Sequence, residues 1–503
     1  MTHTNSRFTP TRFTLTRSLL TAALLLGPAS AATLTVGLDA DPPKLDPALS
    51  TAFVDRQVMN QIFDKLVDVN ENLKVVPMVA KSWTITNGGL TYTFKLNSGI
   101  KFTDGTPLDA EAVKYSIERN MTLEGSARKG ELASVKEVRV ADPATVVITL
   151  KAPYGPLLAV LSDRSGMIVS PAAAQKAGKD FAGAPVGSGP FQFVSRVRQD
   201  NVTLKANPCY WRGAPKLDGL VFRPFPDGDV RVANLLSGAV QVITPVDPKD
   251  IATIQKNPKL EVNTYQGIGF QGVWMNVTRP PFNNKLVRQA LSATFDRDAI
   301  NKVVFLGTVK PAGGPFPPGT PAYSSAIKVQ VADIAGARKK LAQAGKASVP
   351  FTLLTSPGAV NTQLAQLYQA MAAQAGFQVK IEQVEFGTLL DRADKQNYDA
   401  LMLGWPGRPD PDGNIYEFFH TGGSNNQAGY SDKTIDSLLE KARAQTAMSA
   451  RIATYNVALG KILSDSPYAF TYFSSNTVGA VKTLSGLKAI PDGILRFYGT
   501  DLK

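Results

Sequence analysis

Cysteine and histidine are nearly absent from this 503-residue chain, which has one cysteine, Cys209, and two histidines. A single cysteine cannot form an internal disulfide and leaves no cysteine-rich metal framework. Beyond residue 31 the only histidine is His420, so neither a Ser-His-Asp arrangement nor a two-histidine zinc site is available there. No Gly-x-Ser-x-Gly nucleophile elbow is present either. These absences exclude redox, zinc-finger and the commonest hydrolase chemistries.

Long apolar runs are also absent, because no window approaches the roughly 20 apolar residues that a membrane helix needs. The start of the chain differs from the rest: three arginines precede a short apolar stretch at 19–26, and Ala29-Ser30-Ala31 follows it. This pattern predicts a signal peptide over residues 1–31. Since no cysteine stands at the cleavage point, we expect a periplasmic protein without a lipid anchor.

The charge balance is modest for the length of the chain. There are 54 Lys and Arg against 41 Asp and Glu, which gives +13, and loss of the three arginines in residues 1–31 leaves +10. The longest basic run, 338–340, falls on a predicted helix and is not interleaved with aromatic residues. A groove for single-stranded nucleic acid needs such aromatics. The composition therefore does not indicate a nucleic-acid partner.

The first half of the chain has the pattern of a mixed α+β region, and the whole chain is too long for one core. Residues 83–96 predict a β-hairpin around a glycine-rich turn. Asp109 is placed to cap a helix that runs through Arg119. A second antiparallel pair is predicted at 138–140 and 146–150.

The second half predicts alternating strands and helices in the order β-α-β-α-β. The expected elements are residues 351–355, 361–375, 377–384, 387–395 and 400–404. This order is typical of a parallel sheet covered by helices on both faces. Ligands of such sheets bind beyond the carboxyl ends of the strands. We therefore expect the segment 405–412, which follows the last strand, to border a ligand crevice.

Four separated stretches, in the same order along the chain, resemble the extracytoplasmic solute-binding proteins of the peptide, opine and nickel ABC importers. They are IFDKLVDVNENLKVVPMVAKSWTITNGGLTYTFKLNSGIKFTDGTPLDAEAVKYSIER at 62–119, GSGPFQFVSRVRQDNVTLKANPCYWRGAPKLDGLVFR at 187–223, PPFNNKLVRQALSATFDRDAI at 280–300 and YDALMLGWPGRPDPDGN at 398–414. The match extends over almost the whole chain after residue 31, which chance similarity of one motif would not produce.

The resemblance implies an α/β, two-lobed periplasmic-binding-protein-like fold of the large type II class. On this mapping lobe 1 takes residues 32–265 plus 476–503, and an extra α+β domain of about 55–180 is inserted in it. Lobe 2 takes residues 266–475. The lobes are expected to close on a solute by a hinge motion.

The resemblance also implies a function. We expect a monomeric receptor that captures a peptide or a small carboxylate-bearing, opine-like solute and delivers it to a membrane permease. ATP would be hydrolysed by the importer's own cytoplasmic ATPase, so no cofactor is expected on this chain, and it would meet the membrane only through the permease.

Arg408 is the most informative candidate site residue. Peptide-binding members of the family usually carry an Asp in the segment after the corresponding Trp, where it anchors the peptide's amino group, whereas here the run is Trp405-Pro406-Gly407-Arg408-Pro409-Asp410. An arginine facing the crevice would favour a carboxylate or another anion. Two alternatives stay open: Asp410 takes the amine role, or Arg408 pairs with Asp410 or Asp412 and faces solvent.

Further candidates rest on aromatic character or on the resemblance. Trp405 and Trp274 are candidates for a rigid apolar wall, with burial in the core as the alternative for each. Thr51 and Ala52 are carried over from the family's solute-contacting loop. Asn425 and Asn426 lie in a glycine-rich loop downstream.

The sequence suggests four weaker interpretations. The spacing of Asp410, Asp412 and Asn414 resembles the start of a calcium loop, but Ile415 and Thr421 stand where Gly and Glu are needed, so a turn is expected and no metal site. Nickel would have to arrive with its own chelator, since His420 is alone. A secreted glycoside hydrolase with paired carboxylates is the competing class, and an exported chaperone is a third.

Overall fold

The computed structural model describes residues 1–5, 33–488 and 490–503. Ala32–Lys503 clusters as one compact unit, distinct from Met1–Ala31. The predicted signal peptide and its cleavage site lie outside the described residues, apart from residues 1–5. Within the described part of the chain, every helix is too short or too polar to cross a membrane.

One eleven-stranded sheet organises the unit Ala32–Lys503. Along its main path the strands run in the order β15 (Phe377–Gln383), β14 (Val349–Thr355), β16 (Ala400–Met402), β12 (Leu260–Met275), β17 (Tyr468–Val481), β11 (Val242–Thr244), β1 (Thr33–Leu38), β10 (Gly219–Pro224), β9 (Asn201–Ala206) and β8 (Phe191–Val197). The short β13 (Lys310–Pro311) pairs with β17 off this path. We refer to the part from β11 to β8 as lobe 1 and the part from β16 to β15 as lobe 2.

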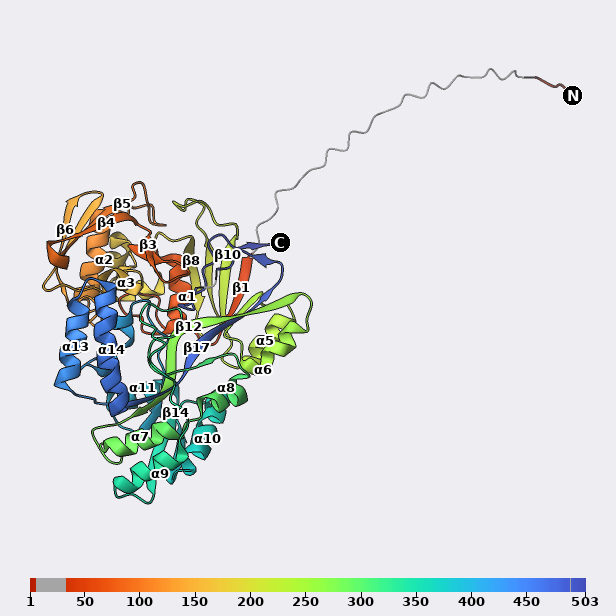
Figure 1. Cartoon of the computed structure of the whole chain (residues 1–503). Helices are drawn as coiled ribbons and strands as arrows, with labels where there is room; N and C mark the ends of the chain where they lie inside the picture. Colours follow the sequence, from red (N-terminus) through yellow and green to blue (C-terminus); the bar gives the residue numbers. More distant parts are fainter. Residues whose placement is uncertain (6–32, 489) are drawn as a thin grey trace. The chain divides into compact units, whose positions relative to one another are not determined.

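The long antiparallel strands β12 and β17 pass from one lobe to the other, and Figure 1 shows them side by side. Their register shifts between Gln266 and Phe270. The lobe boundaries predicted at 265/266 and 475/476 fall on these two strands, next to this irregularity. The sequence did not reveal that two continuous strands of 16 and 14 residues make the crossing.

Lobe 2 confirms the predicted β-α-β-α-β order, with α10 (Ala359–Ala373) and α11 (Phe386–Asp394) between its strands. β14 pairs in parallel with β15 and β16, but β16 is antiparallel to β12, so the sheet is mixed and not wholly parallel as expected. Buried side chains pack on both faces. The covering helices are α7 (Lys285–Thr294), α8 (Arg297–Phe305), α9 (Ile334–Gln343) and α10 on one face, and α11, α12 (Tyr416–Phe419), α13 (Lys433–Ala444) and α14 (Met448–Asp465) on the other.

The predicted hairpin and the capped helix of the first half are confirmed in a separate antiparallel sheet. Its order is β4 (Ala80–Thr86), β5 (Thr91–Leu96), β7 (Thr145–Leu150) and β6 (Val135–Asp142). Tyr92, Phe94 and Leu96 alternate inward and are buried. Asp109 caps α2 (Ala110–Thr122) by accepting hydrogen bonds from the backbone amides of Glu111 and Ala112, at 3.0 and 3.1 Å.

The remaining elements surround these two sheets. They are α1 (Phe53–Ile62), β2 (Val67–Val69), β3 (Val75–Pro77), α3 (Leu157–Val160), α4 (Pro171–Ala177), α5 (Gly228–Leu236), α6 (Pro248–Gln255), β18 (Leu484–Ser485) and β19 (Asp501–Leu502). We retain the inserted domain at about residues 55–180 as a proposed boundary.

Candidate functional site

The segment from α1 to α4, which contains the four-stranded sheet, is called the first-half domain and is counted with lobe 1. A cavity of about 360 Å³ lies between it and lobe 2. We call it the interlobe cavity. Its lobe 1 wall includes the polar residues Thr51, Arg128, Glu131, Tyr154, Asp163 and Arg164. Its lobe 2 wall includes Trp405, Arg408, Asp410, Asp412, Glu417, Asn425 and Arg443. The volume lies within the usual range of small-molecule sites.

Arg164 is the unusual residue of the lobe 1 wall. Arg164 is 2% exposed. Its Nη1 donates to the backbone oxygen of Ser50 at 3.0 Å, and Arg128 donates to the same oxygen at 3.1 Å. Among the ion pairs of the described residues none involves Arg164, and its Nε has no hydrogen-bond partner. Burial, and then the neighbouring Arg128, lower the pKa of Arg164. A buried guanidinium without a carboxylate is costly unless something else neutralises it.

Asp163 stands next to Arg164 and collects the surrounding charge. Its Oδ1 accepts from Nε of Arg56 at 3.0 Å, and its Oδ2 lies 3.6 Å from Nε of Arg408, which comes from lobe 2. Burial by itself would raise the pKa of Asp163, but Arg56, Arg164 and Arg408 together hold it well below its usual range. Asp163 is therefore a permanent anion that bridges the two lobes.

Counting charges shows that this wall is one carboxylate short. Four arginines gather around Asp163: Arg56, Arg128 and Arg164 from lobe 1, and Arg408, whose side chain reaches across from the lobe 2 wall. Three carboxylates face them. Glu131 pairs with Arg128, Asp163 pairs with Arg56 and Arg408, and the buried Asp55 lies near Arg164. One positive charge remains uncompensated, so the wall is suited to one carboxylate from outside.

The lobe 2 wall has the opposite balance. Arg451 holds Asp410 through two bonds of 2.5 and 2.8 Å, and Arg443 contacts Asp412 at 2.7 Å and Glu417 at 3.3 Å. Because Arg408 is directed at Asp163, the two remaining arginines serve three carboxylates. The Glu417 side chain is 31% exposed, and apart from the 3.3 Å contact with Arg443 it accepts only from neutral donors, the amide and hydroxyl of Ser424 at 3.1 Å, among the described residues. This wall is suited to one cationic group, such as an ammonium.

Arg408 is held in the cavity by the loop that carries it. Asn414, which is buried, accepts from the Arg408 amide at 2.8 Å and from Trp405 Nε1 at 3.1 Å. Gly407 approaches the Ile268 backbone with φ of 88°, a conformation that favours glycine. The Arg408 guanidinium lies 4.3 Å from the centre of the Trp405 ring. Burial, and then Arg56, lower the pKa of Arg408 to about 10.

The predicted site residues divide into two groups. Thr51, Trp405, Arg408, Asp410 and Asn425 line the interlobe cavity. The solvent-facing alternative for Arg408, paired with Asp410 or Asp412, is wrong, because those carboxylates are taken by Arg451 and Arg443. The interactions of Asp410 with Arg451 also occupy both of its oxygens, which weakens the amine role considered for it.

Trp274, Ala52 and Asn426 are not among the cavity-lining residues. Trp274 is 1% exposed and packs its ring against Tyr468 at 4.3 Å and Phe418 at 6.1 Å, so its expected contact with a solute is corrected to a core role. Asn426 donates to the backbone oxygens of His420 and Tyr430 and so fixes its own loop. Ala52 is the N-cap residue of α1.

The expected turn at 410–413 is present as a short 3₁₀ helix, Pro411–Asn414, whose first amides are capped by Asp410. The carboxylates of Asp410 and Asp412 form ion pairs with Arg451 and Arg443. Among the described residues, no group of three His, Cys, Asp or Glu is arranged to hold a metal ion.

The sequence interpretation missed Arg56, Arg128, Arg164, Arg443 and Arg451. The one available signal is the pair Asp163-Arg164, which Ser162 alone separates from the apolar stretch 157–161. Charges adjoining an apolar run are candidates for burial, but their partners come from segments far away in the chain.

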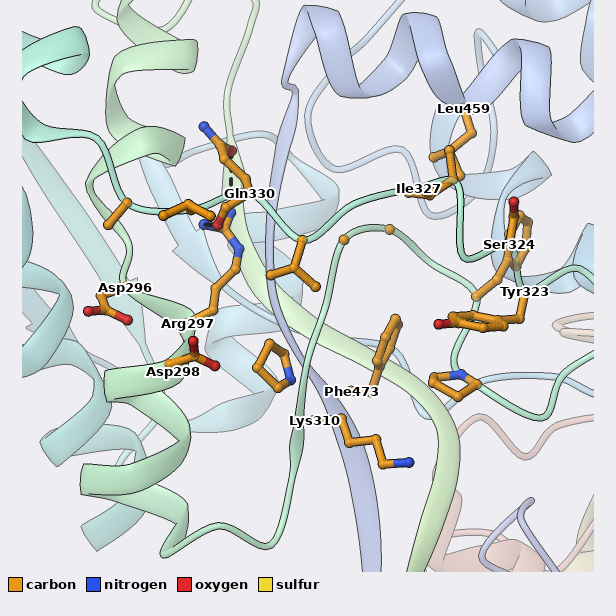
Figure 2. Close-up of a pocket in the computed structure, with 18 of the residues that line it drawn as sticks. Asp296, Arg297, Asp298, Lys310, Tyr323, Ser324, Ile327, Gln330, Leu459 and Phe473 are labelled. Atoms are coloured by element: carbon orange, nitrogen blue, oxygen red, sulfur yellow. Dashed lines mark hydrogen bonds between the residues drawn. The ribbon is translucent and has the colours of Figure 1, made fainter.

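A larger hollow of about 730 Å³ lies entirely within lobe 2 (Figure 2). Figure 2 shows Arg297 directed toward Gln330. Arg297 donates to the backbone oxygens of Phe470, Phe295 and Gln330 at 2.8 to 3.1 Å, so its charge already serves the protein. This hollow touches only one lobe, and we assign the functional site to the smaller interlobe cavity.

Comparison with known proteins agrees with a two-lobed binding protein. A family model described as bacterial extracellular solute-binding proteins, family 5 Middle, matches residues 74–426. The glutathione-binding protein GsiB of Salmonella paratyphi A is 30% identical over 491 residues, which cover 95% of this chain and 96% of that protein.

Solved structures give the same result. The ABC transporter-associated periplasmic binding protein DppA from Helicobacter pylori, in complex with peptide STSA, superimposes with a TM-score of 0.86 at 27% identity, covering 94% of this chain and 98% of that one. The binding protein AgaA from A. tumefaciens R10, in complex with agropinic acid, has a TM-score of 0.84 at 28% identity and covers 94% and 99%.

Proposed function

This chain belongs to the bacterial extracellular solute-binding proteins of family 5, and from that premise we propose that it captures a short zwitterionic, peptide-like solute for an ABC importer. The observation that carries the proposal is the charge imbalance of the interlobe cavity. Arg164 leaves the lobe 1 wall short of a carboxylate, and Glu417 leaves the lobe 2 wall short of a cation. A solute with one carboxylate and one ammonium neutralises both walls at once.

Such a solute also explains why both lobes are needed. A ligand shifts an open–closed equilibrium only by the difference in its affinity for the two states. A zwitterion that contacts Arg164 and Glu417 gains both contacts only when the lobes are together. The volume of about 360 Å³ favours a solute of two or three residues. The relative solved with the peptide STSA supports this class, because that peptide has one carboxylate and one ammonium. The relatives named for glutathione support the peptide-like character of the solute.

We place the protein in the periplasm after removal of residues 1–31, as a monomer that delivers its solute to a permease. ATP hydrolysis belongs to the importer's ATPase. The glycoside hydrolase alternative is disfavoured, because such enzymes need a carboxylic acid that stays protonated near neutral pH. Asp163, Asp410 and Asp412 each pair with an arginine. Saturable binding without turnover of glycosides supports the receptor, whereas product formation contradicts it.

The test combines identification of the native solute with blocked analogues. Mass spectrometry of material that copurifies with the protein is expected to give a small zwitterion. Calorimetry then compares L-Ala-L-Ala with its N-acetyl and C-amide derivatives, and glutathione serves as a larger probe. Each blocked derivative is expected to bind at least tenfold more weakly, because it leaves one wall uncompensated. Equal affinity of all three, or binding of none of the probes, overturns the proposal.

A further inference from the structure

Asp163 occupies the place where a solute carboxylate would have the most cationic neighbours. It touches Arg56 directly, lies 3.6 Å from Arg408 and adjoins Arg164 in the chain. Its side chain is 9% exposed and lines the interlobe cavity. The protein therefore already supplies one carboxylate to the arginines that would bind the solute.

An internal carboxylate at this position limits how many solute carboxylates the arginines can neutralise. With Asp163 ionised, the three lobe 1 arginines together with Arg408 from lobe 2 face three carboxylates, and one further anion completes the balance. A second anionic group of the solute would lie near Asp163, with no unpaired arginine left to neutralise it. Like charges placed close together in a dry site repel each other strongly, since water does not screen them.

We propose that Asp163 is a specificity-determining residue, which limits the lobe 1 wall to solutes that present a single carboxylate there and excludes solutes that present two. This inference rests on the proposed function, because it assumes that the solute carboxylate faces Arg164. Negative selection of this kind is a usual means of discrimination between similar ligands.

The pair L-Ala-L-Gln and L-Ala-L-Glu tests the proposal, because the two dipeptides have nearly the same shape and differ by one carboxylate on the C-terminal residue. The wild-type protein is expected to bind L-Ala-L-Gln at least tenfold more tightly in calorimetry. In Asp163→Asn the ratio of the two affinities is expected to move at least tenfold toward L-Ala-L-Glu. The isosteric amide still accepts a bond from Arg56.

Two variants separate charge from position. Arg56 is buried behind Asp163 and is not among the cavity-lining residues. The double variant Arg56→Gln/Asp163→Asn restores the charge balance and is expected to return the ratio to within threefold of the wild-type value. Arg56→Gln alone removes one cation and is expected to shift the ratio further toward L-Ala-L-Gln, which provides a test even if Asp163→Asn does not fold. Asp64→Asn, a buried carboxylate outside the cavity, should leave the ratio unchanged.

An unchanged ratio in Asp163→Asn and Arg56→Gln overturns the inference. An equal loss of affinity for both dipeptides in Asp163→Asn also overturns it, because that result assigns Asp163 a structural role as a bridge to Arg408. Failure of the wild-type protein to bind either dipeptide is different: it overturns the proposed function and the inference together.

Discussion

The two walls of the interlobe cavity use the same residue types with opposite results. On the lobe 2 wall each arginine has its carboxylate: Arg451 grips Asp410, and Arg443 grips Asp412. On the lobe 1 wall Arg164 forms no ion pair with any described residue, although it is as buried as Arg451. The paired arginines have their charge neutralised by the protein itself, and in our proposal the solute supplies the missing carboxylate to Arg164. Arg164 and Arg451 share residue type and burial, so the difference between them lies in the number of their ion-pair partners.

The largest expected effect concerns the paired side of this comparison. Arg451→Met leaves Asp410 as an unpaired buried charge and is expected to lower the free energy of unfolding by about 3–5 kcal/mol. Urea unfolding measures it. Lys395→Met is the matched control, because Lys395 and Asp391 form an exposed pair whose loss is expected to cost less than about 1 kcal/mol. Equal stability of Arg451→Met and the wild-type protein would contradict the structural role.

A third environment sharpens the contrast, since Asp64 is buried among neutral donors only. It accepts bonds from Ser188, Tyr210 and Trp211 at 2.8 to 2.9 Å. Burial outweighs these bonds and raises the pKa of Asp64 to about 6, whereas arginines lower the pKa of Asp163. The folded state binds the Asp64 proton more tightly than the unfolded state does. The protonated carboxyl group therefore contributes its full stabilisation below about pH 4, and this stabilisation is lost as the pH rises to about 6.

Two pKa units correspond to about 3 kcal/mol of this decline. Urea unfolding of the wild-type protein and Asp64→Asn between pH 4 and pH 7 isolates it. We expect the wild-type protein to lose more stability than Asp64→Asn over this interval. Parallel pH profiles would show that Asp64 titrates normally.

Elements with local signals were predictable from the sequence. The Asp109 cap depends on its own next three residues, and the hairpin of β4 and β5 depends on alternation and a turn. The position of the segment 405–412 beside a cavity was predictable because it follows shortly after β16, and Trp405, Arg408 and Asp410 do line the interlobe cavity. In each case the decisive residues are neighbours in the chain.

The rest depends on contacts between distant segments. Trp274 lies on β12, and the packing of α12 and of Tyr468 from β17 against it decides that its ring is enclosed. Arg164 and Arg408 meet around Asp163 although 244 positions separate them, as their residue numbers show. No local sequence pattern predicts which arginine forms an ion pair with a carboxylate.

Arg164→Met removes the unpaired charge and tests the other side of the comparison. Affinity for L-Ala-L-Ala is expected to fall about 100-fold, or about 2.7 kcal/mol, because the solute carboxylate loses its buried partner. Stability is expected to change little, since Arg164 forms no ion pair among the described residues and Asp55, its nearest carboxylate, keeps its hydrogen bonds from the Lys44 amide and the Ser50 hydroxyl. Calorimetry and urea unfolding on the same preparation give both values. Lower stability with unchanged affinity would make Arg164 a structural residue.

Arg408 is intermediate, because it has one loose partner at 3.6 Å. Arg408→Ala is expected to weaken capture of L-Ala-L-Ala by more than tenfold, and Arg408→Glu by more, since the sign of the charge reverses. Arg338→Ala serves as the control, because Arg338 is exposed and contacts only the Gln374 backbone in the part of the chain that the structure describes. Unchanged affinity in calorimetry would remove Arg408 from the site.

The smallest effect concerns the contact that brings the two walls together. The Gly155 amide, from the first-half domain, donates to the Arg443 backbone oxygen at 2.9 Å, and a Cβ at this glycine would stand 2.5 Å from the Gln445 oxygen. Gly155→Ala should therefore hinder closure and weaken L-Ala-L-Ala binding about three- to tenfold without altering a charge. Gly183→Ala, where a Cβ meets open space, is the control. In small-angle scattering with L-Ala-L-Ala bound, the Gly155→Ala variant should have a larger average radius of gyration than the wild-type protein, because its lobes close less completely. Equal affinity and scattering in both variants would mean that the walls meet without needing this glycine.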